Sequence, residues 1–420
     1  MSVTEKTPSR TSAAFPWVGL IVLAGAVFLS VTSEMMPTGL LPDMSASLGV
    51  SEAQIGLLVT VFAFTVVATS TPLTALTRRL PRHGMIVGIL LVLAISNALT
   101  AIAPNYGFVV GSRILGGIAH GMFWAVVGAY AGHLVPKDQI GRAVSITLGG
   151  GTLAFVFGVP LGTFAGHAFG WRLSFGILAG LMVVGALLVW RFLPAVERDE
   201  VVAHKRVRGS ARKPRDTTIP AVVMVCAIAA VTMIGHYSFY TFVVPFMTDV
   251  MGVPAGNVSA LLFAYGIAGA VGLVLAGSVL GPRPQAGLVM AIILTALSVT
   301  VLSIFAGQPI VAIGAFVLWG LAFGTLPPLL QTRLLHTSSP AFRDTASALY
   351  TTAFNIGIGG GALVGAWIFD LGGVTELPLV YVGILVVSFV LVLVVGRMTR
   401  PSAHTASTPK VSSSSTASAA

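Results

Sequence analysis

The sequence has 420 residues, of which 55% are hydrophobic and only 9% are charged, with a formal net charge of +10. Soluble domains carry roughly a quarter charged residues, so this composition excludes a chain that stays in solution on its own. Long uncharged runs, each near the roughly 20 residues that cross a bilayer, instead indicate an all-α membrane protein.

Twelve apolar segments follow one another along the chain, and each is long enough to cross the membrane. The predicted spans are residues 17–41, 55–76, 85–103, 108–135, 143–169, 173–190, 219–248, 258–280, 286–306, 310–331, 345–369 and 379–396. The first span is too long for the core of a signal peptide, so we expect it to remain as a helix.

Polar segments divide these spans into two groups of six. The expected parts are an N-terminal segment 1–16, a six-helix half 17–193, a central loop 194–218, a second six-helix half 219–397, and a disordered tail 398–420. The central loop is basic, and the tail is rich in Ser, Thr and Ala, a composition typical of disorder.

The basic residues lie almost entirely on one side of this arrangement. If the N-terminus is cytoplasmic and each span crosses once, all of the 23 Lys and Arg residues except Arg113 and Arg172 fall on the cytoplasmic side. Such a bias is the positive-inside rule, and it predicts that both termini are cytoplasmic. The positive charge is therefore assigned to topology and to contact with lipid headgroups, and not to nucleic acid.

Glu34 in the first span and Arg113 in the fourth are charged residues predicted to lie well inside the membrane, at similar depth. A charge in hydrocarbon costs about 2.5–3.5 kcal/mol or more, so such groups pair with one another or line a cavity. Burial disfavours a charged carboxylate and a neighbouring arginine favours it, which suits a group that gains and loses a proton. Glu34 and Arg113 are predicted to couple transport to protons. The alternatives are a structural salt bridge, or a Glu34 that reaches the outer interface.

Polar and aromatic residues in the fourth, seventh and eleventh spans are candidates to line a substrate cavity. His120 and Trp124 are four residues apart and share a helix face, as do His236 and Tyr240. The candidate substrate-binding residues are His120, Trp124, His236, Tyr237, Tyr240 and Asn355. The alternatives are hydrogen bonds between helices, plain packing, and an aromatic belt near the outer interface.

The fifth span is rich in glycine and contains Gly150, Gly158, Pro160 and Gly162. Glycines let helices approach closely, and a proline removes one backbone donor and kinks the helix. The segment is predicted to lie at the interface between the halves and to serve conformational change, with plain close packing as the alternative.

The loop after the second span carries Arg78, Arg79 and Arg82. It is predicted to be a cytoplasmic gate loop, and the alternative is that its charges only fix the topology.

Motifs of other protein classes are absent from the sequence. It contains no phosphate-binding loop and no Cys/His cluster. ATP-driven transport is therefore not expected, and we expect no metal and no cofactor. A membrane-bound enzyme would need acids or histidines clustered at one membrane face, and a channel would need no coupling carboxylate, so neither reading is favoured.

These motifs resemble the major facilitator superfamily, in its drug and sugar branch of proton antiporters. The resemblance is carried by Arg113 with Gly117, and by the glycine segment 149–151 followed by Gly158-Val159-Pro160-Leu161-Gly162. Within that branch the stretches around His120, His236 and Asn355 are most similar to bacterial sugar efflux transporters of the arabinose-export type. One departure is the loop after the second span, where the family's usual acid is missing and Thr77 precedes Arg78.

The resemblance implies two six-helix halves that rock about a site near the middle of a bacterial inner membrane, in a monomer. It implies a proton-coupled efflux transporter of small neutral molecules, with sugars or glycosides as the expected substrates. Exporters of chloramphenicol-type drugs and of nucleosides share much of the same pattern and remain alternatives.

Overall fold

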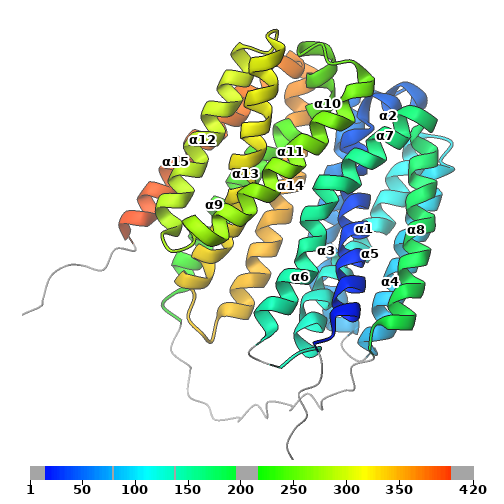
Figure 1. Ribbon diagram of the computed structural model, residues 1–420, viewed down its shortest axis with the longest axis vertical. Helices are drawn as coiled ribbons and strands as arrows, with labels where there is room; N and C mark the ends of the chain where they lie inside the picture. The colour runs from blue at the N-terminus through cyan, green and yellow to red at the C-terminus, as the bar shows by residue number, and fades with distance from the viewer. Residues whose placement is uncertain (1–14, 78–79, 137–138, 195–215, 399–420) are drawn as a thin grey trace, which may run out of the picture.

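The computed structural model describes residues 15–77, 80–136, 139–194 and 216–398, and these form a bundle of long helices (Figure 1). Within these ranges, twelve helices are long and apolar enough to cross a membrane. The first half contains α1 (Trp17–Gly39), α2 (Leu41–Leu48), α3 (Glu52–Leu76), α4 (Arg82–Ala101), α5 (Tyr106–His133), α6 (Ile140–Leu153), the π-helical η3 (Ala154–Gly158), α7 (Val159–Phe169) and α8 (Trp171–Phe192). The second half contains α9 (Ile219–Tyr240), α10 (Val243–Pro245), η4 (Phe246–Val250), α11 (Ala255–Leu275), η5 (Ala276–Leu280), α12 (Pro284–Ile304), α13 (Pro309–Thr337), α14 (Arg343–Gly372), η6 (Val374–Glu376) and α15 (Leu377–Met398).

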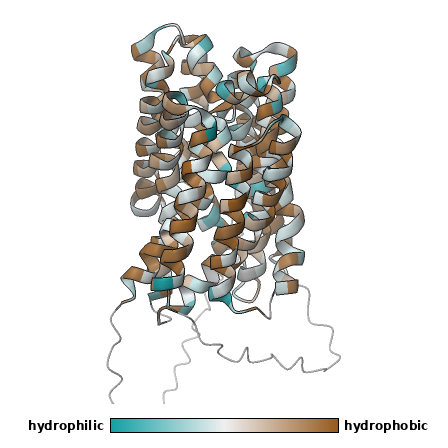
Figure 2. Cartoon of the chain, turned by 90° about the vertical axis from the view of Figure 1, so that its right-hand side faces the viewer, coloured by the Kyte–Doolittle hydropathy of each residue, from teal (hydrophilic) through white to brown (hydrophobic). Residues whose placement is uncertain are grey.

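Apolar side chains cover the outside of the bundle. Figure 2 shows hydrophobic residues along the length of the helices and hydrophilic ones mainly at the two ends. Ile293, Leu297 and Trp367 expose 51%, 57% and 64% of their surface. An apolar surface this continuous would be unfavourable in water, and it matches the hydrocarbon of a bilayer.

The twelve predicted spans are confirmed; most of their ends agree to within three residues, and two spans end at clearly different positions. The seventh span is predicted to run to residue 248, but α9 ends at Tyr240 and a broken stretch follows. Pro245 has no N–H to donate to the Thr241 carbonyl, which explains the break. The tenth span is predicted to end at residue 331, but α13 continues to Thr337, so Arg333 lies inside a helix and is buried. The expectations for most of segment 1–16, for loop residues 195–215 and for tail residues 399–420 lie outside the described residues.

The two halves touch toward the end of the bundle that lies away from the start of α1. There the Thr60 hydroxyl of α3 donates a 3.0 Å hydrogen bond to the Gly359 carbonyl of α14. The Phe242 ring lies against Gly56, and α10 contacts α2 at the upper end of Figure 1. These contacts hold the halves together at that end.

The glycine-rich segment α6–η3–α7 packs closely on α1. A Cβ atom at Gly150 would collide with the Ala24 carbonyl, and one at Gly158 would collide with the Thr32 side chain. A Cβ at Gly162 would meet the Met36 sulfur. These three glycines therefore face α1 within the same half. The segment as a whole also contacts α11 of the second half, so its predicted place at the interface between the halves is confirmed.

The same segment contains one π-helical turn. The turn η3 ends at Gly158, directly before Pro160, whose missing N–H leaves the Val156 carbonyl without its usual partner. A local change of helical register is a common response to such a gap. The turn brings Phe155 and Val156 against Gly266 of α11, so this part of the segment does reach the second half.

Candidate functional site

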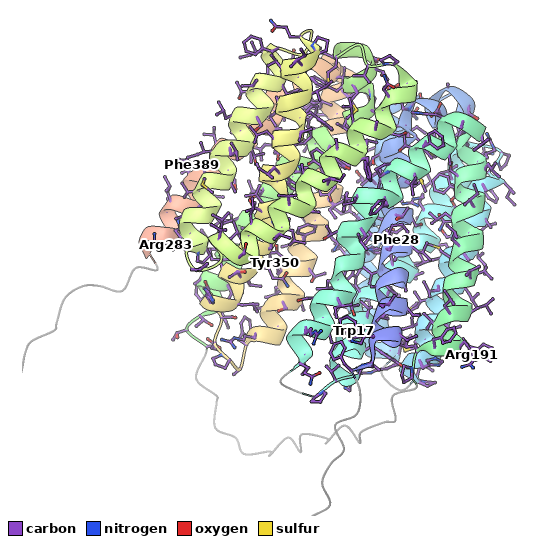
Figure 3. The ribbon with its side chains drawn as sticks, viewed as in Figure 1. Trp17, Phe28, Arg191, Arg283, Tyr350 and Phe389 are labelled. Atoms are coloured by element: carbon purple, nitrogen blue, oxygen red, sulfur yellow. The ribbon has the colours of Figure 1, made fainter. Side chains whose placement is uncertain are left out.

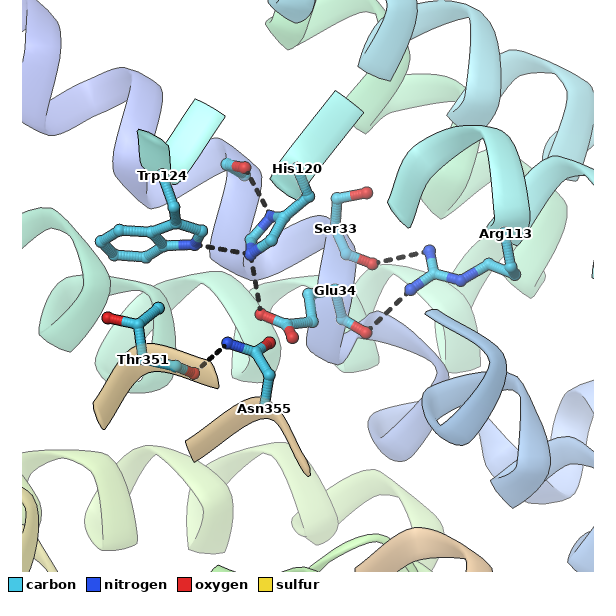
Figure 4. Close-up of polar contacts among 8 residues, drawn as sticks. Ser33, Glu34, Arg113, His120, Trp124, Thr351 and Asn355 are labelled. Carbon is cyan, nitrogen blue, oxygen red and sulfur yellow. Dashed lines mark hydrogen bonds and ion pairs between the residues drawn. The ribbon is translucent and has the colours of Figure 1, made fainter. Parts of the chain in front are cut away.

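The Glu34 carboxyl group lies in the interior of the first half, on α1 (Figure 4). Only 5% of the residue is exposed. Its Oε2 lies 3.3 Å from Nε2 of His120 on α5, and its Oε1 has no hydrogen-bond partner. The carboxyl group thus has one neighbour that can exchange a proton with it, and one oxygen free for another group.

The surroundings of His120 favour its neutral form. Its Nδ1 lies 2.8 Å from the Ser30 hydroxyl, and its Nε2 accepts a 2.6 Å hydrogen bond from the Trp124 indole N–H. An indole nitrogen can only donate, so Nε2 carries no hydrogen when it accepts this bond. Nε2 has one lone pair, so it gives Glu34 no donor, and a protonated Glu34 could donate to it only in place of the Trp124 indole. A carboxyl group without a donor at this position is more stable when it holds a proton.

Arg113 of α5 binds the backbone of α1. Its two terminal nitrogens donate 2.9 Å hydrogen bonds to the carbonyl oxygens of Ser33 and Glu34. The Ser33 carbonyl lacks its helical partner because residue 37 is a proline. The guanidinium also lies 4.3 Å from the centre of the Phe62 ring. Arg113 therefore supplies a missing donor beside Glu34.

Glu34 and Arg113 lie at similar depth, as the sequence predicts. The alternative of a direct salt bridge between their side chains does not agree with this geometry. Within the described part of the chain, no ion pair joins the guanidinium to the Glu34 carboxylate. The charge of Arg113 acts on Glu34 from the backbone side, while His120 contacts the carboxyl group.

A second cluster fills the interior of the second half. The His236 ring of α9 stacks on Phe323 of α13, with centroids 3.3 Å apart, and on Tyr240, with centroids 5.0 Å apart. The Tyr381 hydroxyl lies 3.4 Å from His236 Nδ1. We call this group the aromatic cluster; it comprises His236, Tyr237, Phe239, Tyr240, Tyr265, Phe316, Trp319, Phe323 and Tyr381. Its rings stack mainly on one another, every member except Phe323 is buried, and none carries a carboxylate.

The candidate substrate-binding residues are thus divided between two places. His120 and Trp124 lie beside Glu34, whereas His236, Tyr237 and Tyr240 belong to the aromatic cluster. The first half reaches the aromatic cluster through Phe155 of η3, whose ring centroid lies 6.2 Å from that of Tyr240.

Asn355 of α14 is the remaining candidate. Its side-chain amide donates a 2.9 Å hydrogen bond to the Thr351 carbonyl, and Figure 4 shows it toward the Glu34 carboxyl group. Asn355 is thus a polar side chain of the second half that points to the Glu34 side of the site, without a hydrogen bond to the carboxyl group.

Of the predicted gate loop, only Arg82 is described; Arg78 and Arg79 lie outside the described residues. Arg82 begins α4, and its NH1 lies 3.4 Å from Nδ1 of His133 on α5. In the described ranges, no three His, Cys, Asp or Glu side chains are grouped so as to hold a metal ion.

Several residues of the site were missed by the sequence analysis. Ser30 lies four residues before Glu34, so helical spacing alone could have placed it on the same face. The partners that come from other helices carry no such signal; they are Phe62, Tyr265, Trp319, Phe323 and Tyr381.

Comparison with known proteins gives a consistent result at the level of family. The family model described as Major Facilitator Superfamily matches residues 23–338 and 225–418. A chloramphenicol efflux pump of Mycobacterium tuberculosis (strain CDC 1551 / Oshkosh) is 33% identical over 381 residues, covering 88% of this chain and 91% of the pump. A chloramphenicol efflux pump of another strain, ATCC 25618 / H37Rv, is 32% identical over 380 residues, with the same coverage.

Solved structures agree on the fold. A D-xylose–proton symporter has a TM-score of 0.76 at 15% identity, covering 90% of this chain and 97% of the symporter. A bacterial homologue of the human lysosomal transporter Spinster has a TM-score of 0.73 at 18% identity, covering 92% of this chain and 98% of that chain.

Proposed function

The chain belongs to the Major Facilitator Superfamily and is a multi-pass inner membrane transporter, and we propose that it exports small neutral aromatic compounds of the chloramphenicol type in exchange for protons. The similarity to chloramphenicol efflux pumps supports this substrate class over the sugars or glycosides that the sequence analysis favoured. The sequence motifs resemble arabinose exporters, but neither of those two relatives is named as a sugar transporter.

The observation that carries the proton coupling is the buried Glu34–His120 pair in the interior of the first half. A carboxyl group that is 5% exposed and faces a histidine acceptor can carry a proton through the membrane interior. Arg113 would keep α1 in place at Pro37, so that the carboxyl group stays in position whether or not it holds the proton.

The aromatic cluster supports an aromatic substrate over a sugar. A planar ring gains from stacking on other rings, at about 0.5–1.5 kcal/mol for each pair beyond the area it buries. A sugar instead needs several hydrogen-bonding side chains for its hydroxyl groups. Polar groups of the candidate residues are already engaged inside the protein, as in the pair His120–Trp124 beside Glu34 and the pair His236–Tyr381 in the cluster.

The direction of transport follows from the proposed orientation. With both termini in the cytoplasm, the contacts between the halves lie on the outer side, so the described conformation is closed to the outside. In this state Glu34 would release its proton inward and the substrate would enter from the cytoplasm. Rocking of the halves would then expose the site outward, where the substrate leaves and a new proton binds Glu34. One chain contains both halves, so a monomer suffices.

The test is substrate-driven proton movement in vesicles that contain the purified protein and hold an acidic interior. Chloramphenicol added outside should move protons out of the vesicle, and arabinose should not. A response to arabinose alone would replace the drug assignment by the sugar assignment. Transport of chloramphenicol that is independent of the gradient would overturn proton coupling and leave the substrate assignment intact.

A further inference from the structure

A long groove lies on the outer surface of the second half, away from both clusters. It has a volume of about 1050 Å³ and runs between α12 and α15. Its wall is almost entirely apolar, and the lining includes Ala286, Val289, Met290, Ile293, Leu297 and Leu393. Met290 and Ile293 are each 51% exposed, so the groove opens toward the lipid. None of its lining residues belongs to the Glu34 site or to the aromatic cluster.

The length of the groove matches one leaflet of a bilayer. From Arg283 to Leu297 it follows α12 for about 21 Å, at 1.5 Å per residue. Half of the hydrocarbon core is about 15 Å thick, and the headgroup region adds several Å. The groove therefore begins at the headgroup level and ends near the middle of the membrane.

One end of the groove is marked by Arg283, which has no acidic partner within the described ranges. Arg283 is exposed at the edge of the bundle, near the end of α15 (Figure 3). Its guanidinium has no hydrogen bond or ion pair with any residue in the described ranges. The sequence has no Asp or Glu between residues 250 and 343 and none after Glu376. No carboxylate of α11, α12, α13 or α15 is therefore available to neutralise it.

We propose that this groove binds one anionic phospholipid of the leaflet nearest Arg283, with the phosphate on the guanidinium and an acyl chain along α12. Basic pockets between membrane helices on the cytoplasmic side bind anionic headgroups by the same chemistry. In the orientation proposed above, this lipid comes from the inner leaflet. The apolar wall beyond Arg283 favours a lipid over a free phosphate ion, which would contact only the arginine.

The test measures lipids that stay bound to the purified full chain, by native mass spectrometry in detergent with equal amounts of phosphatidylglycerol and phosphatidylcholine. The wild-type protein should retain one phosphatidylglycerol in preference to phosphatidylcholine. Arg283→Ala should lower that preference about fivefold, the factor expected for one basic residue near the headgroups. The matched control is Arg343→Ala, which removes an exposed arginine at the start of α14, outside the groove.

A second variant tests the groove itself. Ala286→Trp fills the groove beside Arg283 and should reduce retention of both lipids, while the protein stays monodisperse. The proposal is overturned if the wild-type protein retains the two lipids equally, if Arg343→Ala lowers the preference as much as Arg283→Ala, or if Ala286→Trp leaves retention unchanged. These readouts do not involve transport, so they are independent of the proposed exporter function.

Discussion

The first half of the bundle buries Glu34, Arg113 and His120 around α1, whereas the second half buries His236 among aromatic rings. In the second half, α9, α11, α12, α13 and α15 contain no Asp or Glu, and the acids of α14 lie near its two ends. The helices of that half thus have no mid-membrane carboxylate that could carry a proton. The comparison suggests a division of roles, in which the first half handles the proton and the second half offers ring faces to the substrate.

The largest expected effect comes from Glu34→Gln, which removes the acid that lies beside His120. The variant should lose gradient-driven accumulation of chloramphenicol by about 100-fold or more, because an amide cannot carry the proton. Uptake into inverted vesicles with an imposed gradient measures this. Glu376→Gln, in η6 of the second half, is the matched control and should transport normally. Full gradient-driven transport by Glu34→Gln would contradict the proposal that the first half carries the proton.

Removal of the Arg113 guanidinium should mainly destabilise the first half. Arg113→Met leaves the Ser33 carbonyl without a donor, and a buried acceptor left unpaired costs about 1–3 kcal/mol. The Glu34 carbonyl loses a bond as well. Thermal unfolding in detergent should show a lower melting temperature, with Arg113→Lys intermediate because an ammonium group cannot reach both carbonyls in the same fork. Wild-type stability in Arg113→Met would show that the backbone contact is unimportant.

The glycine contact with α1 can be tested by two adjacent residues. Gly150→Ala places a methyl group against the Ala24 carbonyl and should cost about 1–3 kcal/mol of stability. Gly149→Ala meets no heavy atom within 4 Å and should be neutral or slightly stabilising. The melting temperatures of the two variants measure this difference. Equal values would mean that the close packing of Gly150 on α1 does not contribute to stability.

Replacing His236 tests the substrate role of the second half. His236→Ala should weaken chloramphenicol binding about tenfold, the equivalent of about 1.4 kcal/mol, since it removes one stacking surface from the cluster. His236→Phe keeps the ring and should bind nearly as well. Equilibrium binding to the purified protein gives both values. A loss of equal size in both variants would point to the imidazole nitrogens instead of the ring face.

The smallest effect is expected where the halves touch. Thr60→Val removes the hydrogen bond to Gly359, whose net contribution is about 0.5–1.5 kcal/mol. The closed outer side should become about 2- to 13-fold less favoured, which chemical labelling of an introduced cysteine at the outer end can detect. Unchanged labelling would show that other contacts hold the halves together there.

The sequence predicted the number of spans because each crossing requires a long apolar run, and it predicted the depth of Glu34 and Arg113 because helical rise converts residue number into depth. It did not predict what Arg113 contacts. That contact depends on a carbonyl that Pro37 leaves free on another helix. The direction faced by the glycines and the membership of the aromatic cluster depend in the same way on which helices become neighbours.

The central claim is that Glu34 holds a proton that the substrate displaces. The most direct measurement is proton release into a weakly buffered solution when chloramphenicol is added to the purified protein. We expect release from the wild-type protein and none from Glu34→Gln, with binding retained in both. Equal release from both proteins, or binding to the wild-type protein without any release, would contradict it.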